Sequence, residues 1–278
     1  MKLRTITVAL LAVLMSACAA KQSRLVSNTY EFLYPNEEAR TIEPQMAVLE
    51  IPVRVGLAFA PTTQGHSRFD LWSGRTMSGE DLSATEKQKI LRRIADAFRG
   101  KEYVAAIEII PDAYLRNKGG FENLDQLATM YNVDVMALVS YDQMQATDEG
   151  ASSLAYWTLV GAYVVSGEKN STTTLIDTAV FDIDSRRMLF RAPGTSEIKA
   201  SSTLVNLSEA LREDSQKGFE QASAQMIENL DAELERFREK IKEQPETFKV
   251  KERAGYSGGG GVALLLPLVL LGLRVLRD

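Results

Sequence analysis

Residues 49–61 read Leu-Glu-Ile-Pro-Val-Arg-Val-Gly-Leu-Ala-Phe-Ala-Pro, and they predict the first strand of a hydrophobic core. Large apolar residues alternate in this stretch with smaller or polar ones. They are Ile51, Val53, Val55, Leu57 and Phe59. A period of two places such side chains on one face of a strand. The segments that follow this strand decide the fold class.

A helix and a second strand come next. Residues 83–86, Ser-Ala-Thr-Glu, match a capping box, in which the serine hydroxyl and the glutamate carboxylate bind the free amides at a helix start. Apolar residues then recur at helical spacing until Gly100, which ends the helix. Residues 103–110 predict the second strand, and Pro111 ends it.

The same alternation repeats once more. Residues 121–131 carry apolar side chains on one helical face, and residues 133–141 alternate as a strand. Strand, helix, strand, helix, strand is the order of an α/β sandwich with a mainly central sheet. After a polar break at residues 146–153, three further runs predict strands joined by turns: residues 156–165, 172–184 and 187–192.

A long helix is predicted from Asn206 to about Glu243, with Asn206 as its N-cap. Its second half is heavily charged, which is typical of a solvated face and is also compatible with an oligomer contact. The fold class that we expect is therefore α/β. It is a single sandwich domain, residues 46–244, with a mixed sheet, two short helices and one long C-terminal helix.

The segments that flank this domain are polar. Residues 18–45 contain Pro35 and Pro44 and predict a tether, in which Tyr30, Phe32 and Tyr34 alternate as an edge strand would. Residues 245–256 predict a polar spacer.

Residues 1–17 predict an export signal. Lys2 and Arg4 precede an apolar run and a small-residue cleavage site, as in exported chains. A cysteine directly after such a site matches the lipobox of bacterial lipoproteins, which are cleaved before the cysteine and acylated on it. The expected recognition residues and lipidation site are Met15, Ser16, Ala17 and Cys18. Cys18 is the only cysteine, so a disulfide within one molecule is excluded.

Residues 257–278 predict a short membrane segment. A glycine run precedes twelve uncharged residues, Val262 to Leu273, and Arg274 and Arg277 follow them. Twelve helical residues cover about 18 Å, less than the about 30 Å of a bilayer core. The two arginines orient the C-terminus toward the cytoplasm. A permanent anchor and a buried helix of a soluble domain are the alternatives.

The two ends together resemble the rhombotarget lipoprotein family. The tail is similar to the GlyGly-CTERM sorting signal, which is processed by a rhomboid-type serine protease called rhombosortase. The resemblance covers only residues 15–18 and 257–277. It implies four partners: this protease, the lipoprotein signal peptidase, the acylation machinery and a membrane. The implied processing region is Ser257, Gly258, Gly259, Gly260 and Gly261. Ala19 after the acylated cysteine implies the outer membrane.

Charge restricts the partners of the exported body. The whole chain has a formal net charge of −5, and loss of both end segments makes it −8. Nucleic acids and anionic lipid headgroups bind to surfaces with clustered Lys and Arg, so neither is expected as a partner.

Chemistry-bearing motifs are scarce in the body. It has one histidine, His66, and no nucleophile elbow, phosphate loop or metal-ligand cluster, so no catalytic residue, metal or cofactor is expected. Asp182 and Asp184 are interpreted as turn residues. The leading hypothesis is a non-enzymatic envelope lipoprotein.

Two other functions stay open. One is an envelope assembly or secretion accessory protein that binds a protein partner, because the element order resembles the periplasmic α/β domain of curli-secretion and Tol-type lipoproteins. The other is a hydrolase.

Overall fold

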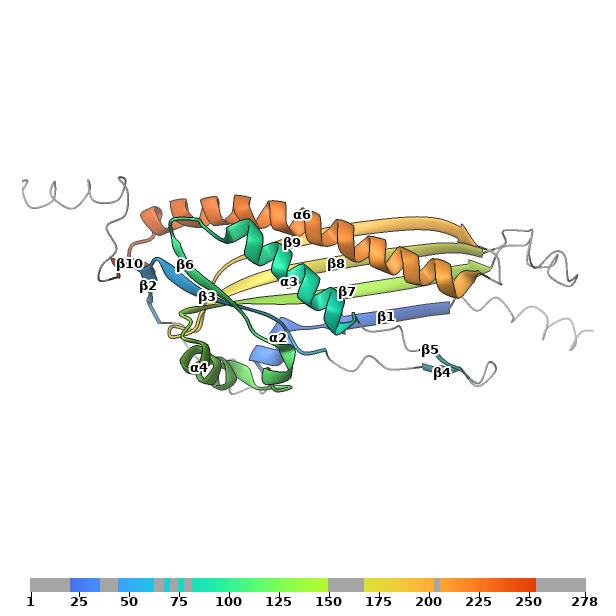
Figure 1. Cartoon of the computed structure of the whole chain (residues 1–278), viewed down its shortest axis with the longest axis horizontal. Helices are drawn as coiled ribbons and strands as arrows, with labels where there is room; N and C mark the ends of the chain where they lie inside the picture. The colour runs from blue at the N-terminus through green and yellow to red at the C-terminus, as the bar shows by residue number, and fades with distance from the viewer. Residues whose placement is uncertain are drawn as a thin grey trace, which may run out of the picture.

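The structure is a computed structural model of the 278-residue chain. It describes residues 21–35, 45–62, 68–70, 75–77, 82–149, 168–202 and 206–253. The α/β fold class is confirmed: a mixed sheet has helices on both faces (Figure 1). One face carries α3 (Ala84–Phe98) and the 37-residue α6 (Leu207–Glu243), and the other carries α2 (Thr29–Leu33) and α4 (Gly120–Tyr131).

The main sheet has six strands, five of which follow the order β6-β3-β7-β8-β9. Their bounds, with those of the sixth strand β1, are β1 Lys21–Ser27, β3 Val53–Phe59, β6 Val104–Ile109, β7 Val135–Glu149, β8 Glu168–Asp182 and β9 Arg187–Ser202. β3 is parallel to β6 and β7, whereas β7, β8 and β9 are antiparallel neighbours. β3 and β1 share one edge of β7, because β3 pairs with residues 135–139 and β1 with residues 141–147.

Two smaller sheets and a short 3₁₀ helix complete the described fold. β2 (Ala47–Ile51) pairs in parallel with β10 (Phe248–Glu252), and β4 (Arg68–Asp70) pairs with β5 (Arg75–Met77). The 3₁₀ helix η2 spans Asp112–Tyr114. Figure 1 shows β2 and β10 beside the C-terminal end of α6, so they close one end of the layer between the sheet and α6.

The prediction of one strand over residues 49–61 is wrong in one respect. The stretch forms two strands, β2 and β3, which are separated at Pro52. Proline has no amide hydrogen to donate to a ladder, so pairing is interrupted there. β2 leaves the main sheet and pairs with β10, so the polar spacer predicted for residues 245–256 is also wrong where β10 lies.

The tether predicted for residues 18–45 is wrong over residues 21–35, which belong to the domain. They form β1, paired with β7, and α2, whose Phe32 and Leu33 are buried. The expected edge strand through the aromatic residues is a helix. Its cause is Asn28, whose side-chain oxygen accepts from the amides of Tyr30 and Glu31 and so starts the helix.

Helix starts follow the sequence prediction in one case and depart from it in the other. The capping box of α3 is confirmed, because Ser83 Oγ accepts from the Glu86 amide at 3.2 Å and Glu86 Oε2 accepts from the Ser83 amide at 3.1 Å. Asn206 holds the N-cap position of α6, but its side chain makes no capping hydrogen bond.

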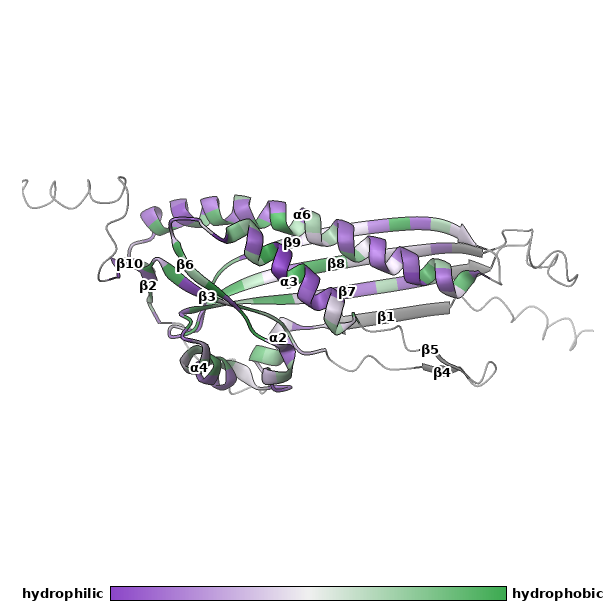
Figure 2. Cartoon of the chain, viewed as in Figure 1, coloured by the Kyte–Doolittle hydropathy of each residue, from purple (hydrophilic) through white to green (hydrophobic). Residues whose placement is uncertain are grey.

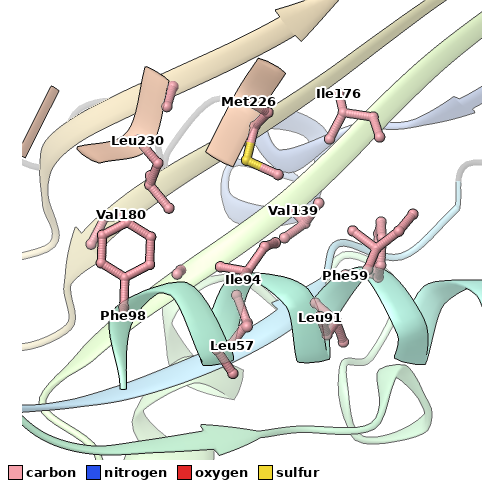
Figure 3. Close-up of a cluster of buried hydrophobic side chains, with 14 of the residues drawn as sticks. Leu57, Phe59, Leu91, Ile94, Phe98, Val139, Ile176, Val180, Met226 and Leu230 are labelled. Atoms are coloured by element: carbon pink, nitrogen blue, oxygen red, sulfur yellow. The ribbon is translucent and has the colours of Figure 1, made fainter. Parts of the chain in front are cut away.

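α3 and α6 pack on the sheet through one hydrophobic cluster. Figure 3 shows Leu91, Ile94 and Phe98 of α3 reaching toward the strands, with Met226 and Leu230 of α6 on the same side. Figure 2 shows the matching pattern along both helices, in which hydrophobic residues alternate with hydrophilic ones. A second cluster lies between the opposite face and the helices α2 and α4.

Candidate functional site

The turn between β8 and β9 contains the two aspartates singled out in the sequence. Asp182 accepts hydrogen bonds from the amide of Ser185, at 3.1 Å, and from its hydroxyl. Burial raises the pKa of Asp182, and these bonds oppose the shift. Asp184 is exposed. The interpretation as turn residues is confirmed for Asp182, and the described residues contain no group of three His, Cys, Asp or Glu that could hold a metal.

A charged cluster joins β3, β7 and the end of β10. Asp134 accepts from the Arg54 amide at 2.9 Å and from the Arg253 guanidinium at 2.7 Å, and it forms an ion pair with Arg54. Burial by itself raises the pKa of Asp134, but the bonds from Arg54 and the charge of Arg253 outweigh it and leave the pKa below its usual value. Arg54 and Arg253 both bind this one carboxylate, so the cluster links the main sheet to the small sheet of β2 and β10 and has a structural role.

A polar layer lies between the N-terminal half of α6 and the sheet. On the sheet it covers the second half of β7, the first half of β8 and the second half of β9. The buried polar residues that the strands contribute are Gln143, Asn170, Thr172, Thr174, Ser196 and Ser202. Gln143 donates to Thr174 Oγ1 at 2.8 Å and accepts from the Ser215 hydroxyl at 2.7 Å. The layer is therefore held by hydrogen bonds more than by apolar packing.

Asp214 and Asn170 are the exceptions in this polar layer, since Asn170 Oδ1 also lacks a hydrogen-bond partner among the described residues. Asp214 is 5% exposed, and its Oδ2 atom has no hydrogen-bond partner among the described residues. Burial raises its pKa, with a smaller opposing effect of Lys217. A raised pKa means that the folded chain binds the proton more tightly than the unfolded chain does. Stability that depends on this group is therefore lost as the pH rises from 3.8 through the raised pKa.

We expect Asp214→Asn to raise the free energy of unfolding at pH 7.5 by about 1 kcal/mol, because it removes a buried charge that lacks a full set of partners. The gain should shrink as the pH falls toward 4. Urea unfolding at a series of pH values measures both effects. Glu213→Gln is the control, since the neighbouring Glu213 is exposed and lies 3.8 Å from Lys217. Equal effects of the two variants would contradict the prediction.

The strongest candidate for a ligand site is an apolar cavity of about 490 Å³. It lies between the sheet face and the C-terminal half of α6, with the end of α3 on one side and β2 and β10 at its end. Small-molecule sites are typically cavities of about 300–1,000 Å³ with mostly apolar walls. Its floor is formed by the strands, through Val53, Val55, Ile107, Val135 and Ala137.

The wall from α6 is also apolar. It contains Leu230, Leu234, Phe237 and Ile241, which recur at helical spacing. Leu234 and Ile241 are only half-buried, as are Val53 and Val55 on the floor. These apolar side chains therefore keep surface that the protein itself does not cover.

Charged residues frame the mouth of the cavity. Arg238 and Lys242 come from α6, Glu102 from the segment before β6, and Glu252 from β10, and all four are exposed. Tyr103 stands beside them, with the Arg238 guanidinium 6.0 Å from its ring centre. Burial raises the pKa of Tyr103.

The same segment is fastened to α6 by an ion pair. Lys101 Nζ lies 3.0 Å from Asp231 Oδ1, and Arg93 of α3 lies 3.2 Å from Glu220. These exposed contacts bridge α3 and α6 above the sheet. Exposed ion pairs contribute little stability, so the bridge can open at low cost.

Sequence analysis did not predict this cavity. It predicts one long helix to about Glu243, but periodicity cannot show that the wall opposite that helix is incomplete. The residues that it did predict as sites lie outside the described residues: Met15, Ser16, Ala17, Cys18, Ser257, Gly258, Gly259, Gly260, Gly261, Arg274 and Arg277. His66 and the strand predicted at residues 156–165 lie outside them as well.

Among the described helices, none combines the length and the apolar character needed to cross a membrane. The predicted membrane segment, Val262 to Leu273, is not in the described part of the chain.

The chain matches no family model and no curated protein. Among solved structures it is similar to a PelC variant dodecamer from Paraburkholderia phytofirmans, with 11% sequence identity, over 77% of this chain and 95% of that one. The TM-score is 0.27, which is too low to support an argument about fold or function.

Proposed function

We propose that the protein is a non-enzymatic lipoprotein of the bacterial cell envelope whose α/β domain binds an apolar ligand. In this proposal the chain is acylated at Cys18 and held at the outer membrane, and a rhomboid-type protease removes its tail within residues 257–261. The lipoprotein signal peptidase and the acylation machinery are its processing partners.

One observation carries the binding role, namely the cavity between the sheet and the C-terminal half of α6. Its walls are apolar, and half-buried side chains such as Val55 and Leu234 line it. A protein interior normally closes such a space, because unfilled apolar volume costs stability. An open apolar cavity with a charged mouth has the character of a ligand site.

Photolabelling tests this binding role on the full chain in its native membrane. The probe is an alkane that carries a diazirine group, and labelled peptides are mapped by mass spectrometry. We expect label on the cavity peptides of β3 and α6. Leu234→Trp should remove that label by filling the cavity, whereas Arg236→Gln, an exposed position on the same helix, should leave it unchanged. Absence of label from the cavity peptides would refute the binding role.

The processing part of the proposal has a separate test. We expect replacement of Gly258 and Gly259 by leucine to block tail removal, because an intramembrane protease needs extended backbone and glycines unwind easily. Intact mass of the protein from its native membrane is the measurement, with a rhombosortase-deficient strain alongside. The unmodified chain should lack residues 1–17, carry acyl groups and end within residues 257–261 only when the protease is present. Unchanged processing of the double variant would contradict the expectation.

A further inference from the structure

We infer that the cavity binds a single-chain lipid, with its acyl chain between the sheet and α6 and a zwitterionic head group at the charged mouth. The inference rests on the proposed function, since it names the class of ligand that the same cavity takes. It follows from three properties of the cavity: its volume, the composition of its walls and the charges at its opening.

The volume leaves little room for a protein helix as the occupant. An α-helix with its side chains is about 10–12 Å wide, so one turn of 5.4 Å fills roughly 400–600 Å³. The cavity of about 490 Å³ therefore holds about one turn. If each methylene takes about the 30 Å³ share of a liquid water molecule, the same space holds a chain of roughly sixteen carbons.

The walls suit a hydrocarbon chain. The floor residues Val53, Val55 and Ile107 and the α6 residues Leu234 and Ile241 are all aliphatic. Polar groups that could orient a polar ligand are confined to the mouth, where the exposed lining residues lie. A ligand that satisfies both regions has an unbranched apolar body and a polar end.

The charges at the mouth select the head group. Arg238 and Lys242 are one helical turn apart on α6, and the carboxylates of Glu102 and Glu252 come from the other lining segments. Both cations are already paired with carboxylates on α6, Arg238 with Glu235 at 3.0 Å and Lys242 with Glu239 at 2.8 Å, so the mouth presents both signs of charge side by side. A head with a single sign of charge therefore meets both attraction and repulsion. A phosphate joined to an ammonium group is complementary to both signs of charge. The acidic net charge of the chain likewise disfavours an anionic head.

A weak attachment beside the mouth lets a ligand enter the cavity. The segment that carries Glu102 and Tyr103 is attached to α6 by the exposed pair Lys101 and Asp231, 3.0 Å apart. Opening this contact and that of Arg238 with the Tyr103 ring separates the segment from α6 without disturbing the hydrophobic cluster under α3.

Competition against the photoreactive alkane tests the inference on the full chain in its native membrane. The competitors are three palmitoyl lipids: lysophosphatidylethanolamine, the free fatty acid and monopalmitoylglycerol. We expect the zwitterionic lysolipid to suppress cavity labelling at a concentration about tenfold lower than the other two. The double variant Arg238→Gln, Lys242→Gln should abolish this preference while the alkane still labels. The matched control is Arg236→Gln, Lys240→Gln on the same helix.

A second variant that fills the cavity controls for loss of label caused by misfolding. Val55→Phe fills the cavity from the floor, as Leu234→Trp does from α6, and circular dichroism melting shows whether each variant is folded. Labelling of the cavity in both folded variants would overturn the site. Labelling by the alkane with equal competition by all three lipids would overturn the head-group assignment and leave the binding role standing. Absence of alkane label in the unmodified chain would overturn both.

Discussion

Gly194→Ala is expected to lower the free energy of unfolding by about 3 kcal/mol, since the added methyl group has no space. Gly194 lies in β9 directly under α6. A Cβ atom there would approach the Ala222 carbonyl oxygen, the Met226 amide nitrogen at 2.5 Å and the Met226 Cβ at 2.7 Å. Two of these atoms belong to the helix backbone, which cannot turn aside as a side chain can. The helix must therefore move away from the strand.

The helix is held at this place from several sides. Asn229 donates to the Pro193 carbonyl at 2.6 Å, and Gln225 accepts from the Thr195 amide at 2.6 Å. These bonds flank Gly194 on β9, so a shift of α6 strains both of them. They also satisfy backbone groups at the outer edge of β9, which protects this part of the edge from pairing with another strand.

Gly100→Ala is the matched control for this prediction. Gly100 has a positive φ of 85° but open space around the added Cβ. Its substitution should cost only about 1 kcal/mol, the conformational penalty of a left-handed residue. Urea unfolding of both variants gives the comparison. If Gly194→Ala costs no more than Gly100→Ala, then α6 does not rest against β9 as closely as the structure shows.

Tyr141→Ala is expected to lower the free energy of unfolding by about 4 kcal/mol. The side chain is 2% exposed and lies in β7 between the sheet and α6. Its ring is in edge-to-face contact with Phe59 of β3, at 6.0 Å between centroids, and with Phe219 of α6, at 5.5 Å. Its removal leaves a cavity where three elements meet.

Tyr141→Phe separates the ring from the hydroxyl. The hydroxyl lies 3.4 Å from Thr62 Oγ1, and a hydrogen bond typically contributes about 1 kcal/mol, so this variant should lose only about that much. Thermal and urea unfolding of the two variants measure the difference. Similar losses for both would show that the hydroxyl contributes more than the ring contacts do.

Local elements were predictable where hydrogen bonding and side-chain period act over a few residues. The capping box at Ser83 starts α3, and the alternation of Val53 to Phe59 forms β3, both as expected. The turn after Asp182 was also recognised, because aspartate and serine form local hydrogen bonds there.

Longer-range pairings were not predictable. β10 was expected to be a spacer because Lys249, Lys251 and Glu252 make it polar, yet its partner β2 lies two hundred residues earlier in the register Phe248 to Ala47. β7 and β9 extend beyond the predicted strands into the polar layer. There Gln143 donates to Thr174 Oγ1 and to the Ser215 carbonyl of α6, so polar residues occupy an interior that a hydrophobic pattern does not reveal.

The sequence alone determined the α/β class and the order of most elements, because these follow from composition and short-range period. Export and processing of the two end segments stay predictions. The tertiary structure decided where α6 contacts the sheet, namely at Gly194 and the polar layer. It also decided where α6 and the sheet are separated by the cavity. At that place β2, β10 and the end of α3 meet around Leu234 and Val55. A cavity exists only where separate elements fail to fill the space between them, so no single stretch of sequence encodes it.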